Sequence, residues 1–499
     1  MIMKRWYYPA LALLLGLFTA QVLATAQVYL SNIELYRTVL PIKDAGYFLI
    51  PNEQIMPRLQ TWGPALFGGL FFTLSIGVGL SLLSLAAAWI WDRLVLRNKS
   101  FLILYLVLWG GSFVLVNYRG FSPLISLYFL FVPTVVFNAS LRWIGQQANR
   151  AAWLDRMTHA VPLLLLAILW TSQMDRNLFL DLRDKLLLSN PIGTKINDFY
   201  YDYTLYPAEV FKTMDQKMLK ACDLEAIQKE PVAGVLEKTL LNHDYLNVGR
   251  ADRVDLEIEE VGNDLVFKNR GKIVLRTTLK DFLARPETVL KEFSLTIDKY
   301  GFFRQFTFFS LLFGFPIALY IFLYTLSRLL AGLFLNSRPS SAVASILCFF
   351  VGLAFLIVLN SGEGKNIEVK DLKEALKANS WQKRVEGLKV VEREKMEIAS
   401  FPAYRALLRS PRIQERYWLV RALGVSRRLE SYQDLLTFLD DPHHNVVGMA
   451  FYALGQRGDP RAIKEIVRRI EVSDHWYNQW HAYRALRTLG WKQSKKPPH

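Results

Sequence analysis

The sequence predicts an α-helical polytopic membrane protein with about seven transmembrane helices, a small α+β extramembrane domain and a C-terminal α-solenoid. Three observations lead to this prediction. Hydrophobic residues, 52% of the chain, gather in long blocks, a polar segment interrupts these blocks, and the C-terminal part repeats one pattern. The predicted domains are residues 1–173 with five apolar blocks, 174–305, 306–360 with two further blocks, and 361–499.

The apolar blocks match the length of membrane-spanning helices, which need about 20 apolar residues to cross the hydrocarbon core. The fifth block has the shortest apolar run. The first block follows Lys4 and Arg5 and ends near Ala24-Thr25-Ala26, so a transmembrane helix and a cleaved secretory signal are both open interpretations. The blocks cover residues 8–28, 63–91, 101–117, 121–138, 159–173, 306–326 and 342–359.

Basic residues in the short loops predict a cytoplasmic N-terminus. In that orientation ten Lys and Arg residues, Arg150 among them, lie in cytoplasmic loops and four lie in the short outer loops, as the positive-inside rule requires. Seven crossings then place residues 174–305 and 361–499 outside the cytoplasm, which is the periplasm for a protein of the bacterial inner membrane. If the fifth block does not cross, both segments lie in the cytoplasm.

One block carries a helix-packing face of small residues. Gly69, Thr73, Gly77 and Ser81 recur every four residues, so they line one side of a helix and allow another helix to approach closely. That helix belongs either to the same chain or to a partner membrane protein. The middles of the blocks lack Asp, Glu, Lys and Arg, which argues against ion-coupled transport.

The polar segment 174–305 alternates helical and strand patterns and is expected to be an extracytoplasmic α+β domain. Asn190-Pro191 and Gly193 indicate an irregular stretch near its start. Asn269-Arg270-Gly271 indicates a hairpin turn between two apolar runs. Helices are expected over residues 208–219, 232–242, 279–283 and 287–293, and strands over 254–258, 265–267 and 273–275.

An aromatic run precedes these elements. Five of the ten residues from Asn197 to Tyr206 are aromatic, including Tyr200, Tyr201, Tyr203 and Tyr206. A tyrosine buries its ring and keeps its hydroxyl hydrated, which suits an interface. Three interpretations stay open: the run packs in the domain core, lies at the bilayer surface, or binds a partner.

The C-terminal segment contains an internal repeat. Residues 419–424, 450–455 and 482–487 align at spacings of 31 and 32 residues, and a period in the low thirties with helical patterning predicts stacked helix pairs. The central Ala of each pattern allows adjacent helices to approach closely. The glycines that follow are expected to end helices, and they are Gly424, Gly455, Gly458 and Gly490.

These repeats resemble the HEAT-like family, in the short bacterial type also found in phycobilisome lyases, over residues 370–491. The resemblance implies a solenoid that binds protein partners along an extended face, and it implies no lyase reaction. Four repeats are few, so the solenoid suits a single partner or docking onto the chain's own loop domain.

Catalytic motifs, cofactor loops and metal-type cysteine spacings are missing from the sequence. We therefore expect no catalytic residue, no cofactor and no metal, even though His443, His444, His475 and His481 gather near the repeat turns. The net charge of +16 comes without a basic-aromatic motif, so we expect lipid bilayer and unidentified protein partners rather than nucleic acid. The leading hypothesis is a membrane scaffold or assembly factor. A transport or lipid-handling component is the alternative, and a membrane enzyme is the weakest hypothesis.

Overall fold

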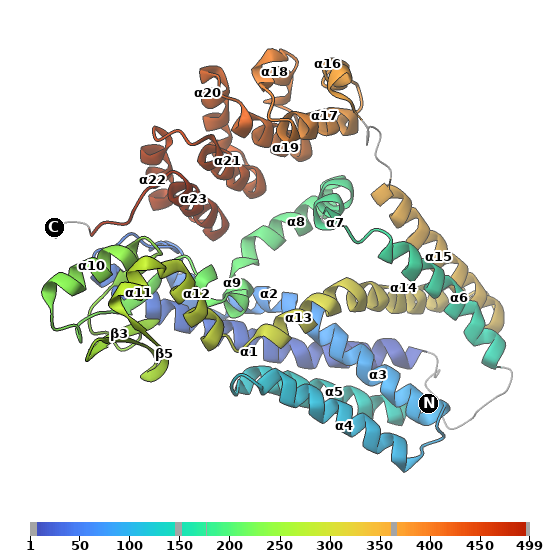
Figure 1. Ribbon diagram of the computed structural model, residues 1–499. Helices are drawn as coiled ribbons and strands as arrows, with labels where there is room; N and C mark the ends of the chain where they lie inside the picture. The colour runs from blue at the N-terminus through green and yellow to red at the C-terminus, as the bar shows by residue number, and fades with distance from the viewer. Residues whose placement is uncertain (1–6, 145–151, 176, 361–366, 496–499) are drawn as a thin grey trace.

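The structure, a computed structural model, describes residues 7–144, 152–175, 177–360 and 367–495. Long helices fill the lower part of Figure 1, an α+β domain lies beside one end of them, and the repeats lie above. Lys4, Arg5 and Arg150, which contribute to the charge comparison, lie outside the described residues.

Six of the described helices are long and apolar enough to cross a membrane, where the sequence predicts seven crossings. Among the residues whose side chains the structure describes, the fifth block contributes a shorter apolar helix, Val161–Thr171. The helices are α1 (Tyr8–Asp44), α2 (Trp62–Phe72) continued through η3 (Thr73–Gly77) into α3 (Val78–Arg93), α4 (Lys99–Asn117), α5 (Pro123–Trp143), α6 (Ala152–Thr171), α13 (Gly301–Phe309) continued through η6 (Ser310–Gly314) into α14 (Phe315–Ala331), and α15 (Ser337–Asn360).

These helices run between two common ends. The connections α3–α4 and α14–α15, the end of α5 and the start of α6 lie at the end near the N-terminus, and the polar domains lie toward the opposite ends (Figure 1). Helix α6 also runs from the first end toward α7 (Leu178–Asp181) and packs along α15. The α6–α15 pair stands apart from the bundle of α1 to α5 and is joined to it mainly by α14.

The α+β domain is built on a five-stranded sheet with strand order β2-β1-β3-β4-β5. The expected hairpin forms between β4 and β5, and Arg270 and Gly271 take positive φ angles of 53° and 73° in its turn, as a two-residue hairpin turn requires. Two short parallel strands, β1 and β2, are additional to the predicted ones. The core of the α+β domain contains three fully buried phenylalanines, Phe267, Phe282 and Phe293. The elements are β1 (Lys220–Asp223), α10 (Glu230–Leu241), β2 (Tyr245–Asn247), β3 (Leu256–Val261), β4 (Asp264–Asn269), β5 (Lys272–Thr278), α11 (Leu279–Ala284) and α12 (Pro286–Ile297).

The repeats form two helical layers. Helices α17, α19, α21 and α23 pack on one another in sequence to make the inner layer, and α18, α20 and α22 make the outer layer (Figure 1). The elements are η7 (Val369–Asp371), α16 (Leu372–Ala375), α17 (Trp381–Arg393), η8 (Ile398–Ser400), α18 (Tyr404–Leu407), α19 (Ile413–Val425), α20 (Leu429–Thr437), η9 (Phe438–Asp440), α21 (His444–Arg457), α22 (Ala462–Val472) and α23 (Trp476–Thr488).

The repeat glycines have two different roles. Gly458 ends α21 with a left-handed φ of 73°, as expected of a helix-ending glycine. Gly424 and Gly455 instead lie inside the last turns of α19 and α21, which corrects the expectation that they end helices. A Cβ on Gly424 would lie 2.8 Å from the Cβ of Ala453. These two glycines therefore let successive inner helices approach closely.

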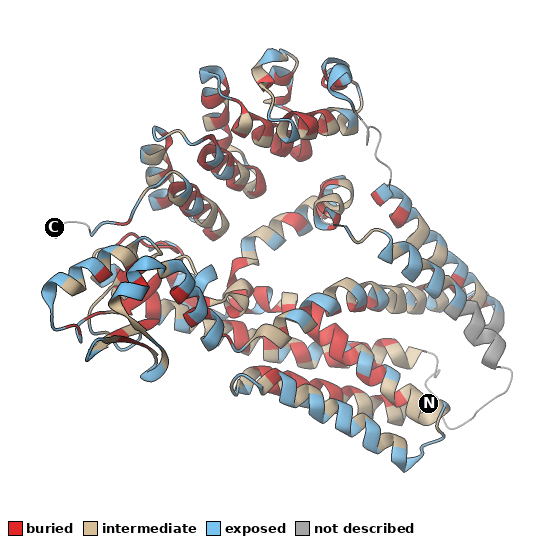
Figure 2. Ribbon diagram, viewed as in Figure 1, coloured by how far each residue is buried: buried red, intermediate tan, exposed pale blue. Residues whose placement is uncertain are grey.

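The repeats do not stand apart from the rest of the molecule. One continuous core joins the inner layer to the end of α1, to the segment 45–56 and to strands β1 and β2, and Figure 2 shows the inner layer as largely buried. Asn52 donates to the carbonyl of Ile470 at 2.9 Å, and its backbone amide donates to Oε1 of Gln479 at 2.9 Å. The segment 45–56, which contains Asn52, continues into η2 (Met56–Gln60).

Candidate functional site: the segment between the apolar helices and the repeats

The segment 182–211, called the docking segment below, links the long apolar helices to the repeats. It comprises η4 (Leu182–Leu187), α8 (Pro191–Tyr203) and α9 (Leu205–Phe211), followed by η5 (Met214–Gln216). The expected irregular stretch is in fact the start of α8. Asn190 caps this helix by accepting from the amide of Gly193 at 2.8 Å, and Pro191 occupies its first turn. Asn followed by Pro is a good helix start because Pro needs no amide partner there.

The beginning of the docking segment is locked to α19 by buried polar groups. Arg183 pairs with Asp184 at 2.7 Å and lies 3.8 Å over the ring of Tyr417. Asp184 Oδ2 accepts from the indole of Trp418 at 2.8 Å. Gln414 donates to the carbonyl of Asp184 at 3.0 Å. A buried charge pair requires this many partners, because each unpaired polar atom would be costly.

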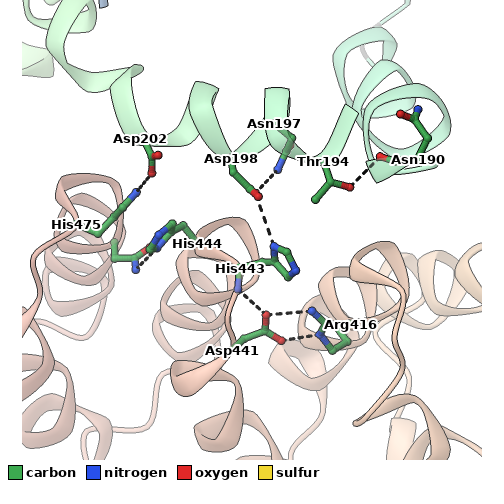
Figure 3. A network of polar contacts seen from close by, with 11 residues as sticks. Asn190, Thr194, Asn197, Asp198, Asp202, Arg416, Asp441, His443, His444 and His475 are labelled. Carbon is green, nitrogen blue, oxygen red and sulfur yellow. Dashed lines mark hydrogen bonds and ion pairs between the residues drawn. The ribbon is translucent and has the colours of Figure 1, made fainter. Parts of the chain in front are cut away.

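The middle of the docking segment crosses the beginnings of α21 and α23. Asp198 and Asp202 lie one turn apart on α8, opposite His443 and His475 (Figure 3). Asp198 Oδ1 lies 3.6 Å from Nδ1 of His443, and Asp202 Oδ1 lies 3.1 Å from Nε2 of His475. These histidines are the N-cap residues of α21 and α23, so the carboxylates also face the positive ends of two helix dipoles.

The four predicted interface tyrosines have different surroundings. Tyr201 contacts Tyr477 with ring centroids 4.6 Å apart, and Tyr206 contacts Trp476 at 5.1 Å. Tyr203 packs instead on Phe67 of α2, and Tyr200 is exposed. The run therefore serves mainly as an internal interface. Two of its rings contact the repeats and one contacts the long apolar helix that begins with α2.

Burial and neighbouring charges shift the acidities of the site residues. Burial raises the pKa of Tyr206 to about 12. Burial also raises the pKa of Tyr201, and the neighbouring Arg183 opposes that shift. The hydrogen bond from His475 lowers the pKa of Asp202. Burial, together with the nearby His475, lowers the pKa of His444 to about 4. At neutral pH the site therefore holds an ionised carboxylate and a neutral imidazole.

Asp202, His444 and His475 form a group with the donor types that a metal needs, in a chain from which we expect no metal ligands. One ligand atom from each lies within 4.8 Å of the others. The two imidazoles stack with centroids 3.4 Å apart. The sequence places the histidines near each other by the repeat period, but the carboxylate comes from a helix more than 200 residues away. No local pattern signals that meeting.

The helix-packing face is filled by α1 of the same chain. A Cβ on Gly77 would lie 2.5 Å from the Cβ of Ala20, and one on Gly69 would lie 3.1 Å from the backbone nitrogen of Thr25. Thr73 donates to Oε1 of Gln21 at 2.7 Å. Ser81 Oγ lies where a Cβ on Gly16 would be. Of the two interpretations of this face, packing within the chain is the one that the contacts match.

Comparison with known proteins identifies one part of the chain. The search found no matching curated protein and no matching solved structure. A family profile described as HEAT repeats matches residues 402–487, which correspond to the segment from just before α18 to the last turn of α23. Residues 402–487 are therefore HEAT repeats, as the periodicity and the resemblance predict.

Proposed function

We propose that this chain is an integral membrane scaffold or assembly factor that holds a HEAT-repeat surface at a fixed position beside the bilayer. The observation that supports it most directly is the continuous core between the inner repeat layer and the end of α1. A repeat domain attached only by a flexible linker would search a large volume. A repeat domain packed on the membrane-anchored helices holds its binding surface in one orientation. Less entropy is then lost when a partner binds.

The surface proposed for the partner is the outer layer of the repeats. The inner layer is occupied by the docking segment, whereas the outer layer carries exposed charges of both signs. The side chains of Arg405, Arg461 and Arg468 are 66%, 64% and 64% exposed. Each pairs with a nearby carboxylate, but exposed ion pairs contribute little to stability. These arginines are therefore available to a protein partner that carries acidic residues.

Partner capture in mild detergent tests this proposal. The wild-type chain is expected to recover a stoichiometric protein after cross-linking in cells, and the R405E/R461E/R468E variant is expected to recover at least tenfold less. The matched control reverses two exposed charges of the α+β domain, K280E and K291E, and should retain the partner. Repeated recovery of the chain alone would argue strongly against a scaffold.

We further propose that the N-terminus is cytoplasmic and that residues 174–305 and 361–499 are periplasmic. The bias of basic residues toward one set of loops supports this orientation. The course of α6 from one common end of the helices to the other is consistent with a seventh crossing. A reporter that is active only in the cytoplasm, fused after residue 499, tests this orientation. Activity of the fused reporter would contradict the assignment.

A lipid-handling role is the second candidate, and a cavity of about 770 Å³ favours it. The cavity lies between α1, the start of α5 and the α+β domain, and charged residues of both signs line it, including Glu34, Lys212 and Asp298. Gln27 of α1 is buried at its edge, and its Oε1 has no partner among the described residues. Native mass spectrometry should find a bound phospholipid that Q27L loses. Equal lipid content in the two proteins would remove this candidate.

A further inference from the structure

We propose that Asp202, His444 and His475 form a binding site for a divalent transition metal ion, which fastens α8 to the repeats. The three residues come from three separate elements: the last turn of α8, the first residue of α21 and the N-cap of α23. Two imidazoles and one carboxylate are a common protein ligand set for Zn²⁺ with one coordination position left for water. This inference does not depend on which partner the repeats bind.

The separation of the ligand atoms suits a metal ion. Zinc binds an imidazole nitrogen at about 2.0–2.1 Å and a carboxylate oxygen at about 2.0–2.2 Å, which holds those two atoms roughly 3–3.5 Å apart. His475 Nε2 and Asp202 Oδ1 are 3.1 Å apart. A metal ion can therefore replace the proton that these atoms share without moving α8 away from α23.

Two buried polar atoms beside the site have no partner among the described residues, and one of them, Oδ1 of Asn478, would gain a partner in the metal-bound form. Nδ1 of His475 and Oδ1 of Asn478 are both buried and unpartnered among the described residues. The side-chain nitrogen Nδ2 of Asn478 lies 3.1 Å from Nδ1 of His444. A half-turn of this carboxamide lets Oδ1 accept from Nδ1–H, which directs the lone pair of Nε2 toward the ligand group. Such hydrogen bonds commonly orient histidine ligands of metals.

One local change is required for binding. The rings of His444 and His475 are nearly parallel, with an interplanar angle of 12°, and parallel rings direct their lone pairs side by side. One imidazole must rotate about its χ2 angle so that both nitrogens converge on the ion. The charges around His444 favour a cation, because the carboxylates of Asp198, Asp202 and Asp474 interact electrostatically with this imidazole. Arg58 acts on Asp202 with the opposite sign.

Metal titration of the full chain tests the site. The protein is prepared in detergent without a polyhistidine tag, stripped with a chelator and titrated with Zn²⁺ against a chromophoric competitor. We expect one tightly bound Zn²⁺ per chain and at least tenfold weaker binding in D202N, H444Q and H475Q. Cobalt(II) should bind at the same site and give visible absorption bands. N478A, which removes the outer hydrogen bond, should weaken binding by about 10–100-fold.

His443 provides the matched control. It is the N-cap histidine of the preceding repeat and faces Asp198 rather than the metal group, so H443Q should bind Zn²⁺ as wild type does. Hydrogen exchange of residues 191–203 should slow on adding Zn²⁺ to wild type and stay unchanged in D202N. Wild-type binding no tighter than that of D202N, or a loss in H443Q as large as in H475Q, would overturn the inference. D202N keeps the test valid if H475Q does not fold, because Asp202 is half exposed.

Discussion

The two ends of the docking segment hold the repeats in different ways. At η4 the side chains of Arg183 and Asp184 are 8% and 6% exposed. On α8 the side chains of Asp198 and Asp202 are 41% and 45% exposed. A buried charge must keep its partners, whereas a half-exposed charge can exchange its partner for water. The contact at η4 is therefore expected to be a fixed joint, and the contact on α8 an adjustable one.

Replacing Arg183 by Met should give the largest effect. The change leaves Asp184 buried without its cation, and the free energy of unfolding is expected to fall by about 3–5 kcal/mol. Denaturant unfolding in detergent measures it. The double variant R183M/D184N, which is neutral and keeps an acceptor for Trp418, should recover much of the loss. K195M on the exposed face of α8 should leave stability unchanged, and a loss in R183M no larger than in K195M would show that the joint is not fixed.

Replacing Trp418 by Phe should give the next largest effect. A six-membered aromatic ring remains, the five-membered ring of the indole is lost, and Asp184 Oδ2 loses a hydrogen bond of 2.8 Å; a lost hydrogen bond to a charged group costs about 1.5–3 kcal/mol. Trp480 supplies the matched control because its indole nitrogen is buried and has no partner among the described residues. W480F should therefore be neutral or slightly stabilising under the same measurement. Equal losses in the two variants would mean that the ring, not the hydrogen bond, is responsible.

Acid should weaken the repeats through a packed histidine rather than through the half-exposed pairs. Burial, with Arg484 nearby, lowers the pKa of His481 to about 3 from an ordinary value of 6.5. As the pH falls, His481 therefore takes up a proton in the unfolded chain before it does so in the folded chain. Stability is full above pH 6.5 and falls by up to about 1.4 kcal/mol for each pH unit below it, until the folded-state pKa is reached.

The variant H481Q should reduce this acid decline between pH 6.5 and 4.5 in a series of unfolding measurements, and part of the remainder comes from His444, whose pKa burial lowers to about 4. D198N is the control from the adjustable contact and should shift stability by less than about 1 kcal/mol while keeping the decline. A decline that persists in H481Q and disappears in D198N would reverse the assignment.

The smallest effect is expected from single hydroxyl groups of the aromatic run. The hydroxyl of Tyr201 is largely buried and interacts with Arg183, which opposes the rise in its pKa, so Y201F should lower the free energy of unfolding by about 0.5–1.5 kcal/mol. The neighbouring Tyr200 is 51% exposed, and Y200F should be neutral. If both variants behave alike, Tyr201 does not contribute to the joint at η4.

The parts of the fold that local patterns predict are those whose partners are close in sequence. The β4–β5 hairpin follows from one turn, and the inner repeat layer follows from a period that brings Ala422, Ala453 and Ala485 into equivalent buried places. Helix α8 does not follow from local pattern because Asn190-Pro191 is typical of a loop, although the same two residues also begin a helix. Strands β1 and β2 have only four and three residues, which is too short for a clear alternation.

The candidate site could be predicted only as a set of separate pieces. The aromatic run, the repeat histidines and the small-residue face were all visible as unusual patterns. Their partners were not, because Asp202 and His475 lie 273 positions apart in the chain. Trp418 and Asp184 are likewise 234 positions apart. Such contacts depend on how whole domains pack, so no window of neighbouring residues contains them.

The sequence by itself determined that the chain has long apolar helices, a β-hairpin domain and HEAT repeats. Each of these follows from hydrophobic spacing within one helix, one turn or one repeat, where the physical partners are neighbours. Only the tertiary structure decided that α1 fills the helix-packing face and that α8 covers the inner repeat layer. It also decided that Asp202 meets two histidines. These pairings depend on the total burial and polar satisfaction of surfaces that come together only when the domains are packed.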